Sequence, residues 1–134
     1  MQKTFKRNLN SLEEIFDFVN EFIADYKLDD TASYTINLAV EELFTNMVKY
    51  GQNTKNDIQI ELNKENNDLV ISLTDYDVEP FDITKAKDVD VGQHLGERKV
   101  GGLGIHLVKK MMDEVNYEYK NRTSKITLIK HLEN

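Results

Sequence analysis

Residues 101–115 read GGLGIHLVKKMMDEV, which places three glycines within four positions directly before an apolar helical pattern. Glycine lets the backbone come close to a ligand without a Cβ clash. The first turn of a helix has unpaired N–H groups and a partial positive charge, so the two features together favour an anion, most often phosphate. A glycine-rich turn before a helix is also ordinary packing chemistry. The phosphate interpretation gains its support from two further segments, EELFTN at 41–46 and DYDVEPFD at 75–82.

Length and composition indicate one globular domain. The chain has 134 residues, of which 40% are hydrophobic and 31% charged, and this is enough for a core of its own. No apolar run approaches the roughly 20 residues that span a bilayer, and residues 1–7 lead into no signal-peptide core. The absence of cysteine excludes disulfides, thiolate zinc sites and cysteine nucleophiles. We therefore expect a single cytoplasmic domain over residues 1–134.

The charge of the chain bears on its partners. The formal net charge is −7, without a large basic block, which disfavours nucleic-acid binding because that affinity comes mainly from Lys and Arg. A nucleotide needs only a local site and is not excluded. An acidic surface suits a basic protein partner, although many acidic proteins have none.

The first fifty residues predict a short strand and two long helices, at 3–7, 11–26 and 30–50. Ser11 and Glu14 have the spacing of a capping box at the start of the first helix. Residues 28–30 break the pattern with cap residues, and Gly51 closes the second helix.

Two hairpins and a third helix follow. Apolar and polar residues alternate over 58–62 and 69–73, with turn residues at 66–68, and the pattern returns over 117–129 with a turn near 121–124. A helix is expected at 102–113. The weakly patterned, polar stretch 80–100 reads as a mobile loop, since a loop of this length in a compact domain is functional or disordered.

The order of elements predicts an α+β fold. Strands paired as hairpins give a mixed, mostly antiparallel sheet of about five strands. Three helices should cover one face of this sheet, in a two-layer sandwich. This order differs from the alternating strands and helices of a doubly wound fold.

Glu42 and Asn46 lie four residues apart on the long helix, so they share a face, beside the apolar stripe. One interpretation is an ordinary polar pair at a helix edge. The other is a functional pair, in which the Asn46 oxygen binds Mg²⁺ and Glu42 accepts a proton from an attacking hydroxyl.

Asp75 ends the strand that precedes the long loop. It is either a turn aspartate or an acceptor for an exocyclic amine such as that of adenine. Other phosphate motifs are absent: there is no P-loop, and the glycines lack the third position of a dinucleotide fingerprint. His94, His106 and His131 have no metal-like spacing.

In this order, the three segments resemble the nucleotide-binding boxes of the Bergerat-fold, histidine-kinase-like ATPases. The final run is most similar to the bacterial anti-sigma-factor serine/threonine protein kinases. The resemblance implies that Glu42 is the catalytic base, Asn46 the Mg²⁺ ligand and Asp75 the adenine acceptor. It assigns phosphate binding to the glycine box and the arginine before it, namely Gly101, Gly102, Gly104 and Arg98. It also implies further nucleotide contacts, at Lys49, Phe81, Leu103, Ile105 and Thr127.

The chain departs from the family pattern at one box. The family usually has glycine two residues after the adenine-binding aspartate, where this chain has Asp77. The interval from Asp75 to Phe81 also looks one residue longer than common versions. We therefore expect a different backbone near the adenine.

The resemblance implies an ATP- and Mg²⁺-dependent serine/threonine kinase that acts as an anti-sigma factor. Its partners would be a sigma factor and a small antagonist protein, which it phosphorylates, and it would be a homodimer. Nucleic acid and membrane are not expected partners. Two alternatives remain open at this point: a binding module that sequesters a partner such as a sigma factor without catalysis, and a small ATPase without a partner.

Overall fold

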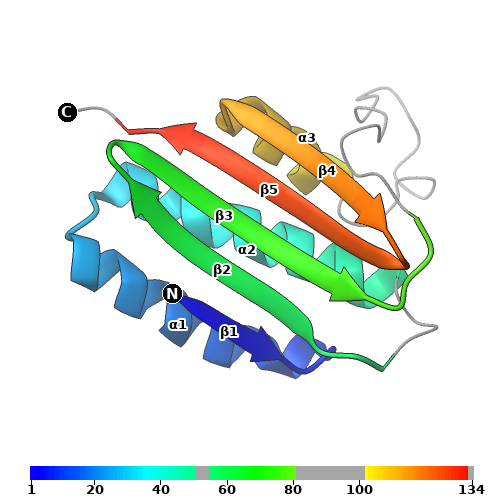
Figure 1. Cartoon of the computed structure of the whole chain (residues 1–134). Coiled ribbons are helices and arrows are strands. Elements are labelled where there is room, and N and C mark those ends of the chain that lie inside the picture. The colour runs from blue at the N-terminus through cyan, green and yellow to red at the C-terminus, as the bar shows by residue number, and fades with distance from the viewer. Residues whose placement is uncertain (51–54, 81–101, 133–134) are drawn as a thin grey trace.

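The computed structural model describes residues 1–50, 55–80 and 102–132. Within these ranges five strands form one sheet in the order β1-β2-β3-β5-β4 (Figure 1). All four pairings between them are antiparallel. The strands are β1 (Gln2–Phe5), β2 (Ile58–Glu65), β3 (Asp68–Tyr76), β4 (Glu114–Lys120) and β5 (Thr123–His131).

Three helices lie on one face of this sheet (Figure 1). They are α1 (Leu12–Tyr26), α2 (Asp30–Tyr50) and α3 (Gly102–Met111). The predicted two-layer α+β fold, with its mostly antiparallel sheet, is confirmed. Among the strands described the sheet is antiparallel throughout, so the parallel component of a mixed sheet is not seen there.

The core lies between the two layers. Alternate residues of the central strands point to the helices and are buried, among them Ile60 on β2, Leu73 on β3 and Ile126 on β5. They pack in one cluster with residues of all three helices, including Phe22, Leu43 and Val108. In this packing α2 contacts β3 of the sheet and both of the other helices, α1 and α3.

The predicted capping box at Ser11 does not form. A 3₁₀ turn, Leu9–Ser11, precedes α1 and places Ser11 in a helical conformation, without a side-chain cap. The Ser11 hydroxyl donates instead to the Lys6 carbonyl at 2.8 Å. Asn8 is the residue that caps, accepting from the Asn10 N–H at 2.8 Å. The physical reason is that the 3₁₀ turn extends the helical conformation before α1, so the capping residue is Asn8, three residues earlier than the helix pattern indicates.

The other boundaries differ by a few residues. Asp29 caps α2 by accepting from the Ala32 N–H at 2.8 Å, as the break at 28–30 predicts, and α2 has its predicted bounds. β1 ends at Phe5, so Arg7 lies beyond the strand. α3 ends at Met111 rather than at 113. Gly51 and most of the 80–100 loop lie outside the described residues. Within the described ranges, no helix has the length and apolar character needed to cross a membrane.

Candidate functional site

Glu42 and Gly104 meet where α2 packs against α3. A Cβ placed on Gly104 would overlap the Glu42 carboxylate, which is the first obstacle it would meet. Gly104 belongs to the first turn of α3, where backbone N–H groups lack partners within the helix. The structure therefore brings together two of the predicted motifs, and the glycine makes room for the carboxylate at a helix N-terminus.

Asn46 lies one turn after Glu42 and is 3% exposed. Its side-chain nitrogen donates to the backbone carbonyl of Glu42 at 2.7 Å. Because only the nitrogen of an amide can donate, this bond orients the group and leaves its oxygen to accept or to bind a cation.

The electrostatics of Glu42 suit a base. Burial raises the pKa of its carboxyl, the charge of Glu41 raises it further, and the charge of Lys49 acts in the opposite direction. A higher pKa makes the carboxylate a stronger proton acceptor. Lys49 is seven residues after Glu42, two helical turns away, and so lies on the same side of α2.

Asp75 is 4% exposed at the end of β3. Its register neighbours are Ile58 on β2 and Ser124 on β5, and it shares the helix-facing side with Leu73. Arg7 forms an ion pair with it, and both side chains are 6% exposed.

No sequence pattern indicated a role for Arg7. Its guanidinium also donates to the Met47 carbonyl at 2.8 Å and to the Asn56 carbonyl at 3.2 Å. The expected strand at 3–7 placed this arginine inside the sheet, and no local pattern indicated a long-range pair. The one available signal was Asp75 at the end of an apolar strand, because a carboxylate buried there would need a cation as its partner.

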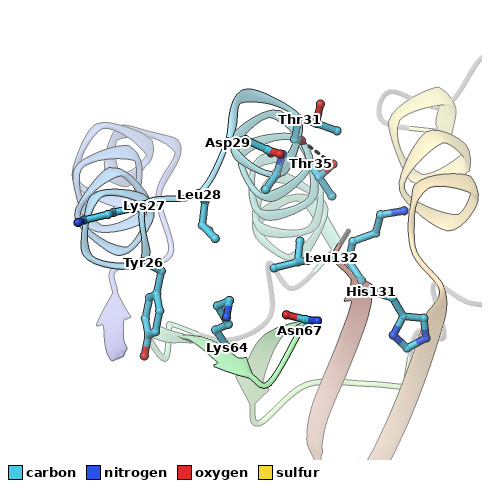
Figure 2. Close-up of a pocket in the computed structure, with 12 residues that line it drawn as sticks. Tyr26, Lys27, Leu28, Asp29, Thr31, Thr35, Lys64, Asn67, His131 and Leu132 are labelled. Atoms are coloured by element: carbon cyan, nitrogen blue, oxygen red, sulfur yellow. Dashed lines mark hydrogen bonds between the residues drawn. The ribbon is translucent and has the colours of Figure 1, made fainter. Parts of the chain in front are cut away.

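A separate cavity lies at the N-terminal end of α2, between the end of α1, the β2–β3 turn and the end of β5 (Figure 2). Its volume is about 390 Å³, and its lining includes Thr31, Lys64, Asn67 and His131. None of the predicted site residues that the structure describes lines it. The nucleotide hypothesis therefore concerns the other part of α2, where Glu42 and Asn46 lie.

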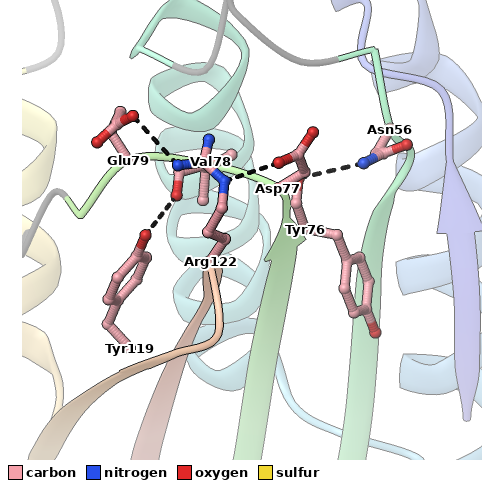
Figure 3. A network of polar contacts seen from close by, with 7 residues as sticks. All are labelled: Asn56, Tyr76, Asp77, Val78, Glu79, Tyr119 and Arg122. Carbon is pink, nitrogen blue, oxygen red and sulfur yellow. Dashed lines mark hydrogen bonds and ion pairs between the residues drawn. The ribbon is translucent and has the colours of Figure 1, made fainter.

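The chain that leaves β3 is held by a polar network (Figure 3). Arg122 donates to Asp77 at 2.8 Å and to Glu79 at 3.2 Å. Its carbonyl accepts from the Val78 N–H at 3.0 Å. Tyr119 donates to the Val78 carbonyl at 2.7 Å. The β4–β5 hairpin thus fixes the path of the segment that follows the candidate adenine acceptor.

Asp77 has φ 56°, the left-handed conformation that glycine adopts most easily. Aspartate is among the residues that tolerate this region better than most. The departure from the family glycine therefore keeps the backbone conformation that a glycine would favour.

The remaining predicted residues divide into three groups. Gly102 and Leu103 begin α3, and Ile105 is 5% exposed in the core. Phe81, Arg98 and Gly101 lie outside the described residues.

Thr127 is not brought to the site. Its hydroxyl shares a 3.3 Å hydrogen bond with Ser72, and both residues point to the face of the sheet opposite Asp75, because neighbouring strand residues alternate. Ser124, the register partner of Asp75, is the polar β5 residue beside Asp75, and no sequence pattern indicated it.

Comparisons with known proteins identify the family and support the fold. The family model described as the histidine kinase-like ATPase domain matches residues 5–130. No curated protein matches the chain in sequence. Among solved structures, the RsbU and RsbW domains of Rv1364c from Mycobacterium tuberculosis are similar, with a TM-score of 0.67 and 15% identity.

The alignment with Rv1364c covers 100% of this chain and 32% of that one. Histidine kinase AdeS from Acinetobacter baumannii is also similar, with a TM-score of 0.56 and 12% identity over 100% of this chain and 68% of the other. At these identities, the two structures support the fold alone.

Proposed function

The chain belongs to the histidine kinase-like ATPase family, and on that premise we propose that it is an ATP-dependent serine/threonine protein kinase. It acts as an anti-sigma regulatory factor and phosphorylates a small antagonist protein. The observation that carries this proposal is the position of the Glu42 carboxylate against the first turn of α3 at Gly104. A proton acceptor and an anion-binding helix terminus are thereby adjacent.

The reaction is a phosphoryl transfer to a hydroxyl. The serine or threonine oxygen forms a bond to the γ-phosphorus of ATP as the bond to the β–γ bridging oxygen breaks, and ADP leaves. Glu42 takes the hydroxyl proton, for which its raised pKa suits it. The glycine box, with Arg98, holds the phosphates, Lys49 contacts the nucleotide, and Asp75 accepts the amine of the base. Such catalysis is mainly positioning and charge neutralisation.

The residues present fit Mg²⁺. Asn46 offers one hard oxygen, since its nitrogen is occupied by the Glu42 carbonyl. No group of three or more His, Asp or Glu that could hold a metal occurs in the described part of the chain. Mg²⁺ commonly uses one or two protein ligands together with waters and substrate phosphates, so Asn46 would suffice. When bound, the cation supplies neutralisation of phosphate charge.

The test uses the purified chain with ATP labelled at the γ-phosphate and candidate small antagonist proteins. Label should move to a serine or threonine of the antagonist. Glu42→Gln should abolish this transfer while ATP binding persists, and Glu41→Gln, at the exposed neighbour, should keep it. Asn46→Ala should weaken Mg²⁺-dependent ATP binding in calorimetry. A Glu42→Gln protein that phosphorylates at the wild-type rate overturns the catalytic role.

A second candidate is a binding module that sequesters a sigma factor or other partner without catalysis, with nucleotide only shaping its surface. The departure from the family glycine at Asp77 favours it, because a charged side chain stands two residues after the candidate adenine acceptor. A stable complex with a partner, without transfer of label, supports this alternative. The kinase proposal also includes a cytoplasmic location and homodimerisation.

A further inference from the structure

Arg7 is held in place by acceptors from three parts of the fold. Its Nη2 donates to Asp75 Oδ1 on β3. Nη1 donates to the Met47 carbonyl on α2 at 2.8 Å, and Nε to the Asn56 carbonyl before β2 at 3.2 Å. All three guanidinium nitrogens are therefore used, and the group is fixed beside the carboxylate.

This arrangement decides what kind of hydrogen-bonding partner Asp75 is. A buried carboxyl without a cation favours its neutral form, which carries an O–H donor. Beside a guanidinium it stays ionised, and an ionised carboxylate only accepts. Burial lowers the pKa of Arg7, but arginine remains protonated throughout the physiological range.

We propose that Arg7 is a specificity-determining residue that keeps Asp75 a pure acceptor, so that the site at Asp75 takes 6-aminopurine and rejects 6-oxopurine nucleotides. The inference rests on the proposed function, which assigns the base to Asp75. Arg7 uses Oδ1, and a carboxylate has further lone pairs on both oxygens. A 6-amino group donates to them. A 6-oxo group would place acceptor against acceptor in a buried site, which is strongly unfavourable.

The other groups around Asp75 do not replace Arg7. Its register neighbours, Ile58 and Ser124, are uncharged. The charged residues next to these two in the chain, Asp57 and Lys125, are exposed. From α2 comes the neutral Met47 carbonyl, with Lys49 the next charged residue along that helix. Among the residues described, only Arg7 forms an ion pair with Asp75.

The experiment measures the dissociation constants of ATP and inosine triphosphate, which has a 6-oxo group, by calorimetry between pH 6 and 8. The variants are Arg7→Met, Arg7→Lys and, as control, Lys6→Met, which removes a neighbouring exposed charge. The wild type and the control should prefer ATP by about 100-fold or more at every pH.

Arg7→Met should lose at least about tenfold of that preference at pH 6, because a neutral Asp75 can donate to the 6-oxo group. The preference should return as pH rises and the carboxyl ionises. Arg7→Lys should restore a preference independent of pH, which a merely structural role for the arginine would not require.

A folded Arg7→Met protein with the wild-type preference at every pH overturns the inference. If that variant does not fold, the wild type decides: a constant preference from pH 8 to 6 supports the role of Arg7, and a preference that falls with acid overturns it. A wild type that binds both nucleotides equally overturns only this inference. A wild type that binds neither overturns the proposed function as well.

Discussion

The Glu42 carboxylate occupies the space that a Cβ on Gly104 would fill. A residue of α2 and a residue of α3, far apart in the sequence, are thus in direct contact, and each constrains the other. The contact explains why a glycine stands at this position of the first helical turn.

Gly104→Ala should push the Glu42 side chain away from the first turn of α3. We expect phosphoryl transfer to fall by about 100-fold, since displacement of a catalytic group by about 1 Å has effects of that size. Transfer rates and ATP affinity should be measured together. Leu107→Ala, at an exposed position of the same helix, is the matched control. A wild-type rate in Gly104→Ala would show that the position of Glu42 does not matter.

The fall of the phosphoryl-transfer rate at low pH, the acid limb of the pH–rate profile, should reflect the protonation of Glu42. The base must be deprotonated, so transfer should fall as pH drops through its raised pKa. Glu41→Gln removes a like charge and should move this limb to lower pH, whereas Lys49→Met should move it to higher pH. Rates measured from pH 5 to 9 test both directions. A limb that stays in place in both variants would mean that another group titrates.

Asp77→Gly should change stability little. Glycine relieves the strain of the left-handed conformation, while the exposed pair with Arg122 is lost, and each effect is worth about 1 kcal/mol or less. Asp77→Val should be destabilising by more than about 1 kcal/mol, because a β-branched residue resists positive φ. Urea denaturation compares the two variants. Equal stability of the valine and glycine proteins would contradict the backbone argument.

His131 should titrate with a pKa above the ordinary value of histidine. A hydrogen bond from the ring to Asp68, at 2.6 Å, raises the pKa of His131. Because the folded pKa lies above the unfolded value, the pair stabilises the fold at low pH, and this contribution is lost as pH rises through the folded pKa. Asp68→Asn should lower the pKa of His131 in an NMR titration, and an unchanged midpoint would assign the shift to another group.

Much of the fold was predictable from local patterns. The helices and strands follow from the spacing of apolar residues, because one buried face imposes its period on the chain. The bounds of α2 and the hairpin turns were predicted because they depend on caps and turn residues close in sequence. The capping box at Ser11 failed because the preceding 3₁₀ turn, which competes for the same residues, has no comparable signature.

The candidate nucleotide-binding motifs could be located in the sequence, since Glu42, Asn46 and the glycines are each defined by short spacings. The position of Thr127 could not be predicted in the same way. Successive residues of a strand face opposite sides of the sheet, so a shift of the register by one residue would move Thr127 to the face on which Ser124 lies. The sequence alone does not fix that register.

By itself, the sequence determined the order of elements, the amphipathic faces and the candidate base, because these depend on neighbours within a few residues. Only the tertiary structure decided that Arg7 pairs with Asp75 and that Glu42 lies against Gly104. Both contacts join segments that are distant in the chain, and they arise from the packing of α2 against the sheet and against α3. No local spacing encodes such a contact.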